Sequence, residues 1–154
     1  MLTLLVLVGL PGSGKTTDAR RLLEAEDKWI RVNRDDLRAM CNPPSAMYGG
    51  GAREDLNRQM SRRCVQFALT SGFNVVVDDT NLVPKTRKYW RDLAVEMSPR
   101  VGGVLLVTLV FRTTVADCIA RDAARAAPVG EKVIRRMAEQ YPEALVLDDA
   151  QEVL

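Results

Sequence analysis

The sequence predicts a single three-layer α/β domain built on a central parallel sheet of four to five strands. Three observations favour this class. The chain has 154 residues, which suits one domain with a substantial core. Its composition, 47% hydrophobic and 27% charged, is that of a globular protein. Short apolar runs alternate with longer helical segments along the chain, and this order is typical of a parallel sheet with helices on both faces.

The expected strands are short apolar runs bounded by turn residues. Leu2–Val8 is a continuous apolar run before Gly9, which is typical of a strand buried on both faces. We expect the other strands at Trp29–Val32, Phe73–Val77 and Gly103–Phe111, with a short fifth strand at Ala144–Leu147.

The expected helices are bounded by capping residues. Asn33 or Asp35 can cap the second helix, Gly72 can end the third, and Pro84 suits the first turn of the fourth. A flexible loop rich in proline and glycine is expected at Cys41–Gly51. The expected helices cover Lys15–Ala25, Asp35–Met40, Ala52–Ser71, Pro84–Met97, Thr114–Ala124 and Glu131–Gln140.

The composition excludes several kinds of site. The chain contains no histidine, so Ser–His and Cys–His nucleophiles and histidine-ligated metals are excluded. The three cysteines lie far apart without a CxxC pair, which indicates a reduced intracellular protein, and we expect it in the cytoplasm. No apolar run reaches the roughly 18 residues of a membrane helix, so no membrane partner is expected. Of the 22 basic residues 17 are arginine, which fits either phosphate contacts or a solvated surface.

A glycine-rich loop follows the first expected strand. Residues 9–16, GLPGSGKT, match GxxxxGK[ST] at every fixed position, and a helix is expected directly after them. The loop amides and the helix N-terminus attract phosphate, Lys15 can reach the β- and γ-phosphates, and the Thr16 hydroxyl can bind Mg²⁺. The sequence therefore predicts binding of a nucleoside triphosphate, with contacts from Gly12, Ser13, Gly14, Lys15, Thr16 and Thr17.

Acidic and basic residues follow the second and third expected strands. Asp35, or Asp36, is placed to orient and deprotonate a hydroxyl, and Arg38 lies one helical turn later. The same residues also fit a helix cap and a solvated helix face. Asp78 and Asp79 end a buried strand, where an acid can bind Mg²⁺ or belong to an Asp–Thr–Asn turn.

Two arginines near the C-terminal third complete the candidate site. Arg121 and Arg125 are four residues apart, so on one helix face they can clamp nucleotide phosphates when a lid closes. They can equally pair with Asp117 and Asp122 on a solvated face. Arg53, Arg58, Arg62 and Arg63 fit either a nucleic-acid track or a solvated face, and Trp29, Tyr89 and Trp90 fit either base stacking or core packing.

Four blocks taken together resemble the phage polynucleotide 5′-kinase family, the kinase part of the end-healing enzymes of nucleic acid repair. They are GLPGSGKTT (9–17), NRDDLR (33–38), DTNLVP (79–84) and ARDAARAAPVGEKVIRRM (120–137). The resemblance implies a P-loop kinase fold over residues 1–154, with a helical lid at about 121–131. Because the family includes phage enzymes, the cytoplasm would be that of the host cell if a phage encodes the protein. Residues 42–63 match poorly, and the chain ends without a DxDGT-like segment, so no 3′-phosphatase activity is expected.

The resemblance also implies a reaction and a set of site residues. The expected activity is Mg²⁺-dependent transfer of the ATP γ-phosphate to the 5′-hydroxyl end of RNA or DNA. Asp35 would activate the hydroxyl, Arg38 would grip the acceptor phosphate, and Arg125, with Arg121 one turn earlier, would act from the lid. The implied acceptor contacts are Asp35, Arg38, Asp79 and Thr80, and the implied metal ligands are Thr16 and Asp79. A kinase of a small hydroxylated molecule, or an ATP-gated nucleic-acid-binding module without transfer, uses the same motifs.

Overall fold

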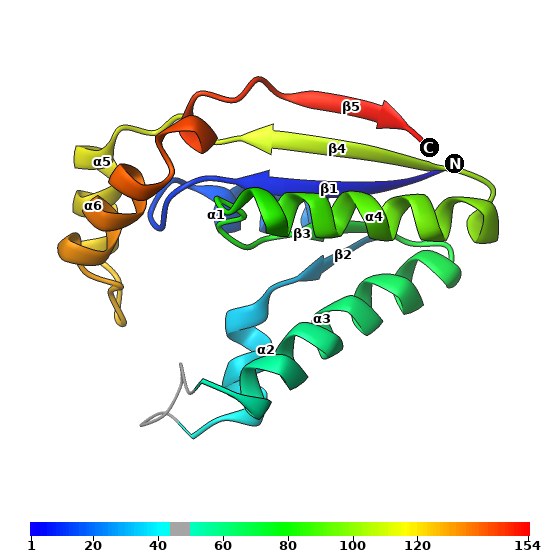
Figure 1. Ribbon diagram of the computed structural model, residues 1–154, viewed down its shortest axis with the longest axis horizontal. Helices are drawn as coiled ribbons and strands as arrows, with labels where there is room; N and C mark the ends of the chain where they lie inside the picture. The colour runs from blue at the N-terminus through cyan, green and yellow to red at the C-terminus, as the bar shows by residue number, and fades with distance from the viewer. Residues whose placement is uncertain (44–49) are drawn as a thin grey trace.

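A five-stranded sheet forms the centre of the molecule, as the computed structural model shows (Figure 1). The structure describes residues 1–43 and 50–154, so most of the loop expected at Cys41–Gly51 lies outside the described residues. The sheet order is β2-β3-β1-β4-β5, and every neighbouring pair except β4 and β5 is parallel. The strands are β1 (Leu2–Val8), β2 (Trp29–Val32), β3 (Asn74–Val77), β4 (Val104–Val110) and β5 (Ala150–Val153).

The fifth strand is not where the sequence predicts it. Residues Pro142–Leu145 form a short 3₁₀ helix, η2, in place of a strand at Ala144–Leu147. Ala144 is fully buried in a cluster with Ile134, and this packing uses the apolar side chains that suggested a strand. The strand is Ala150–Val153, which runs antiparallel to β4 and pairs Val153 with Leu105. Because β5 lies at the edge of the sheet, it is mostly exposed, and its sequence shows no run of apolar residues that would predict a strand.

Helices cover both faces of the sheet. Side chains of α3 and α4 pack on one face around Val65, Leu69 and Leu93, while α1 packs on the other face through Ala19 against Leu7. The helices are α1 (Lys15–Ala25), α2 (Arg34–Cys41), α3 (Ala52–Thr70), α4 (Pro84–Val101), α5 (Val115–Ala123) and α6 (Glu131–Gln140). The three-layer α/β fold is therefore confirmed. None of the helices in residues 1–43 and 50–154 combines the length and the hydropathy of a membrane span.

The helix α4 extends several residues further than expected. α4 continues past Met97, through Pro99, to Val101. It ends at Gly102, whose φ of 76° is left-handed and whose N–H bonds to the Ser98 carbonyl. Pro99 lies inside the last turn of the helix, and the left-handed Gly102 ends it.

A third cluster lies beyond the sheet. α5, α6 and η2 pack together around Leu10, Cys118 and Ile134, next to the carboxyl ends of β1 and β4 (Figure 1). Because the strands β1–β4 are parallel, the segments that follow β1, β2 and β3 meet at this same edge. The predicted phosphate loop and the predicted acidic segments follow those three strands.

Candidate nucleotide and acceptor site

The phosphate-binding loop has a conformation that only glycine allows at two positions. Gly12 has a φ of 80°, and a β-carbon there would lie 2.3 Å from the carbonyl oxygen of Cys118. Gly14, with a φ of 107°, is the N-cap residue of α1. The loop is therefore a tight backbone cradle at a helix N-terminus, which is the geometry that binds phosphate. This arrangement fits the triphosphate that the sequence predicts.

Lys15 is buried in this cradle. Its side chain is only 7% exposed, and its ammonium donates to the carbonyl oxygens of Gly9 at 2.9 Å and Leu10 at 2.7 Å, and to the Ser13 hydroxyl at 3.2 Å. Burial lowers the pKa of Lys15 to about 8. The Thr113 hydroxyl donates to the Ser13 carbonyl at 2.8 Å and supports the loop from outside. Thr16 and Thr17 follow in the first turn of α1.

Asp35 and Arg38 lie together on α2. Asn33 caps this helix, because its side chain accepts a hydrogen bond from the Asp36 N–H at 3.1 Å and donates to the Asp78 carbonyl. Asp35 therefore does not cap the helix. Its carboxylate accepts from Nη1 of Arg38 at 2.6 Å, and its side chain is 53% exposed, open to an incoming group.

Glu54, which sequence reasoning missed, holds the other side of Arg38. Its carboxylate accepts from Nε of Arg38 at 2.9 Å and from Nη2 at 2.6 Å. Arg34 lies 3.6 Å from the same carboxylate. The two charge-assisted bonds from Arg38 hold the pKa of Glu54 below its usual range. The acidic first turn of α3 is the only signal for Glu54 in the sequence.

The acids after β3 face arginines of the second strand and helix. Asp79 accepts from the backbone N–H of Arg34 at 3.0 Å and lies 3.2 Å from its Nε, and burial raises the pKa of Asp79. Asp78 accepts from Nε of Arg31 at 2.7 Å. The Thr80 carbonyl accepts from the Gly9 N–H at 3.0 Å, so this segment is fastened directly to the phosphate loop.

Three groups are available to a magnesium ion. Thr16 lies at the start of α1, and Oδ1 of Asp78 and Oδ2 of Asp79 are buried carboxylate oxygens with no hydrogen-bond partner among the described residues. Oδ1 of Asp79 accepts from the Arg34 N–H, and its Oδ2 lies 3.2 Å from Nε of Arg34. In the described ranges no group of three or more acidic or cysteine ligands occurs. The residues fit a Mg²⁺ ion that takes most of its ligands from phosphate and water.

Arg121 and Arg125 both lie near the loop but not on one helix. Arg121 is in the last turn of α5, and its Nη1 lies 3.8 Å from where a β-carbon on Gly14 would sit. α5 ends at Ala123, so Arg125 lies just beyond it, with Nη1 3.6 Å from Asp122. The expectation of a shared helix face is therefore wrong. The positive charge of Arg125 adds to burial, the main cause, in lowering the pKa of Lys15.

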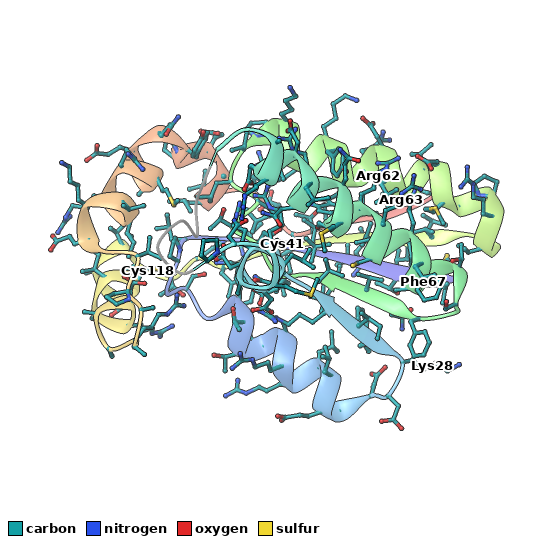
Figure 2. All side chains as sticks on the ribbon, turned by 90° about the horizontal axis from the view of Figure 1, so that it is seen from below. Lys28, Cys41, Arg62, Arg63, Phe67 and Cys118 are labelled. Atoms are coloured by element: carbon teal, nitrogen blue, oxygen red, sulfur yellow. The ribbon has the colours of Figure 1, made fainter. Side chains whose placement is uncertain are left out.

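The four arginines expected along a nucleic-acid track each have a partner on the protein. Figure 2 shows Arg62 and Arg63 on α3, away from Cys118 on α5. Arg62 bonds to Glu96 and stacks over Tyr89, and Arg63 bonds to Gln66. Arg53 donates to the Cys41 carbonyl and Arg58 pairs with Asp55. The track stays a prediction.

The fold and the loop together define a P-loop domain of the kinase type. The chain belongs to the family described as AAA domain (AAA_33), which matches residues 4–144. It is 33% identical over 102 residues, 59% of its length, to a protein of Autographa californica nuclear polyhedrosis virus named as a proposed bifunctional polynucleotide kinase/RNA ligase. The chain spans only 14% of that relative.

Solved structures share the fold. A chain in the structure of the Pnkp1/Rnl/Hen1 RNA repair complex matches 98% of this chain with a TM-score of 0.82 and 28% identity, over 48% of its own length. A gluconokinase from Sinorhizobium meliloti 1021 matches 88% of this chain and 72% of its own, with a TM-score of 0.54 and 22% identity. A shikimate kinase from Acinetobacter baumannii matches 99% of this chain and 86% of its own, with a TM-score of 0.52 and 19% identity. The last two show the fold alone.

Proposed function

We propose that this chain is an ATP-dependent polynucleotide kinase that phosphorylates the 5′-hydroxyl end of RNA or DNA. The observation that carries this proposal is the pairing of Asp35 with Arg38 at the sheet edge that also holds the phosphate loop. An exposed carboxylate beside a guanidinium suits a hydroxyl that carries a phosphate close by. The similarity to a chain of an RNA repair complex and to a viral protein named for polynucleotide kinase activity supports the same acceptor.

The reaction follows from these positions. Lys15 and the loop amides bind the β- and γ-phosphates of ATP. Arg38 binds the phosphate next to the terminal sugar, and Asp35 accepts the proton of the 5′-hydroxyl as that oxygen attacks the γ-phosphorus. The bond from the γ-phosphorus to the β–γ bridging oxygen breaks, and ADP leaves with the electron pair. Arg121 and Arg125 stabilise the negative charge on the transferred group, in a lid of about residues 121–131. Bound Mg²⁺ would neutralise phosphate charge, held through Thr16 and an acid after β3, Asp78 or Asp79.

Transfer of label to an oligonucleotide tests this proposal. With γ-labelled ATP and a 5′-hydroxyl oligonucleotide, we expect labelled oligonucleotide and ADP in equal amounts, and none with the 5′-phosphorylated control. The acceptor KM should rise steeply with salt, because a polymer releases counterions on binding. ADP formation without labelled oligonucleotide, or labelling only of sugars or nucleosides with no salt dependence, contradicts it. Oligonucleotide binding that depends on ATP but gives no transfer indicates a binding module.

A further inference from the structure

We propose that a pocket between α3 and the start of α4 binds the second nucleotide of the acceptor strand. This inference rests on the proposed function and extends it from the terminal nucleotide to its neighbour. The pocket encloses about 290 Å³, close to the lower limit of roughly 300 Å³ for small-molecule sites. Its lining includes Arg34, Arg58, Ser61, Lys85, Tyr89 and Trp90.

The charge of the pocket favours an anion. Three cations line it, and each comes from a different helix: Arg34 from α2, Arg58 from α3 and Lys85 from α4. Arg58 pairs with Asp55, and Arg34 pairs with Glu54 and Asp79. Lys85 makes no ion pair within the described part of the chain, so its charge is the one left for an anionic ligand. The N-terminus of α4 also faces this region, and its first turn carries neither an acidic residue nor a side-chain cap. An uncapped helix N-terminus adds a positive field that attracts phosphate.

Unpartnered polar atoms beside the pocket indicate a ligand. Ser61 lines it and is 1% exposed, yet its hydroxyl has no hydrogen-bond partner among the described residues. Asn57, one helical turn earlier on α3, is fully buried, and both its amide oxygen and nitrogen lack a partner in the same residues. Buried polar groups are nearly always hydrogen-bonded in proteins. A phosphate or sugar oxygen in the pocket would supply the missing partner for Ser61.

An aromatic wall is available for a base. Tyr89 is half-buried in the lining, and its ring meets that of Trp90 edge to face at 5.1 Å. The guanidinium of Arg62 lies 5.4 Å from the centre of the Tyr89 ring and fixes its position. Bases stack on such side chains without sequence preference. Cations, a helix N-terminus and an aromatic ring together match the phosphate and base of one nucleotide.

The pocket neighbours the proposed acceptor site through Arg34. Arg34 lines it, lies 3.6 Å from Glu54, and forms an ion pair with Asp79. Glu54 in turn holds Arg38, which holds Asp35. This places the pocket two ion pairs away from Arg38, which with Asp35 is proposed to hold the terminal nucleotide. The nucleotide placed there is the second one.

Acceptor length tests the inference. We expect the KM to fall about tenfold from a nucleoside 3′-phosphate to a dinucleotide that carries its own 3′-phosphate, through one added phosphate contact and one stacked base. Lys85→Ala and Ser61→Ala should remove most of that gain while leaving the KM of the nucleoside 3′-phosphate unchanged. Lys88→Ala is the matched control, because Lys88 lies on the same helix but pairs with Asp92 at 2.6 Å. Equal KM values for the two acceptors would overturn the proposal that this pocket binds the second nucleotide. The same fall in KM in Lys85→Ala as in the wild type would also overturn it.

Binding without ATP separates this inference from the proposed function. Trp90 lines the pocket, so a dinucleotide should change the intrinsic tryptophan fluorescence of the wild type and of Lys88→Ala. Its apparent Kd should be about tenfold weaker in Lys85→Ala. Binding with this pattern but no phosphoryl transfer supports the pocket and refutes the kinase. Transfer to oligonucleotides with no Lys85-dependent binding refutes the pocket alone.

Discussion

Glu54 accepts hydrogen bonds from two guanidinium nitrogens of Arg38, Nε at 2.9 Å and Nη2 at 2.6 Å. The third nitrogen, Nη1, donates to Asp35 at 2.6 Å. Two side-by-side bonds fix the plane of a guanidinium as well as its position. The arginine proposed to bind the acceptor is thus oriented by an acid from α3, while the base beside it lies on α2. The acceptor site depends on the packing of these two helices.

Replacing Glu54 should weaken acceptor binding. Glu54→Ala leaves Arg38 without its bidentate partner, so we expect the KM of the 5′-hydroxyl oligonucleotide to rise roughly tenfold to a hundredfold. The KM of ATP should stay near its wild-type value, since Glu54 makes no contact with the phosphate loop. Steady-state kinetics with each substrate varied gives both numbers. Asp92→Ala, which breaks an exposed ion pair on α4, is the control, and an unchanged acceptor KM in Glu54→Ala would refute the role of Glu54.

Replacing Asp35 should remove the base but not the nucleotide site. Asp35→Asn is expected to slow single-turnover transfer by about a hundredfold or more and to leave the Kd of ATP unchanged. Asp36→Asn is a matched control from the same turn, because Asp36 bonds to Arg31. It should keep transfer within about threefold of wild type, a change of less than 1 kcal/mol in the barrier. Near-normal transfer by Asp35→Asn would mean that another group takes the proton.

Gly12 should not tolerate a β-carbon. In Gly12→Ala that atom would meet the Cys118 carbonyl at 2.3 Å, so the loop must open and the Kd of ATP should rise at least tenfold. Gly72→Ala is the control, since Gly72 has a similar φ of 83° with nothing within 4 Å. It should lose about 1–2 kcal/mol of stability and keep its affinity for ATP. Calorimetric titration with ATP measures both affinities. Equal affinities in the two variants would mean that the Cys118 carbonyl does not exclude a β-carbon at position 12.

ATP binding should depend on pH through Lys15. Its pKa in the free protein is about 8 because it is buried. A bound phosphate favours the charged form and raises that pKa, so ATP binding takes up a proton above pH 8. Affinity should be flat below pH 8 and fall by up to about tenfold per unit above it. Calorimetry at pH 9 in two buffers of different ionisation enthalpy should show nearly one proton taken up by the wild type and none by Lys15→Ala. Equal uptake by both would assign the proton to another group.

Asn81 should contribute strongly to stability. Its side chain donates to the Leu7 carbonyl at 2.7 Å and accepts from the Trp90 indole at 3.1 Å, and its φ is 46°. Asn81→Leu leaves two buried groups unpaired and should lower the free energy of unfolding by about 2–5 kcal/mol. Urea denaturation measures the loss. Trp90→Phe should lower the free energy of unfolding less in the Asn81→Leu variant than in the wild type, because the indole N–H has already lost its partner there. If the two losses simply add, the hydrogen bond between Trp90 and Asn81 does not contribute to stability.

Local patterns in the sequence were enough to predict most helices and strands of the fold. The bounds of β1, β2, α1 and α6 are confirmed to the residue, because apolar runs and glycines mark their ends. The fifth strand was misplaced because an exposed edge strand has no apolar pattern, whereas Ala144 has one but packs on Ile134. The helix α4 runs four residues past the predicted end at Met97, to Val101, and Gly102 ends it with a left-handed φ.

The sequence likewise predicts one part of the candidate site and not the other. The phosphate loop lies within eight consecutive residues, so its glycines, Lys15 and Thr16 could be recognised directly. The Arg38–Glu54 pair joins two helices across 16 residues, and nothing in the sequence indicates which of several acids would meet which arginine. The pairing of Asp79 with Arg34 likewise spans 45 residues and depends on the alignment of β2 beside β3.

The carboxylate of Asp122, 1% exposed, accepts from the backbone N–H groups of Val129, at 3.2 Å, and Gly130, at 2.8 Å. These bonds join the end of α5 to the start of α6, and Cys118 of α5 and Ile134 of α6 pack in the same buried cluster. Nη1 of Arg125 lies 3.6 Å from the same carboxylate. One buried acid therefore anchors both the arginine proposed to act on the transferred phosphate and the turn that follows it, so the loss of Asp122 would release the two together.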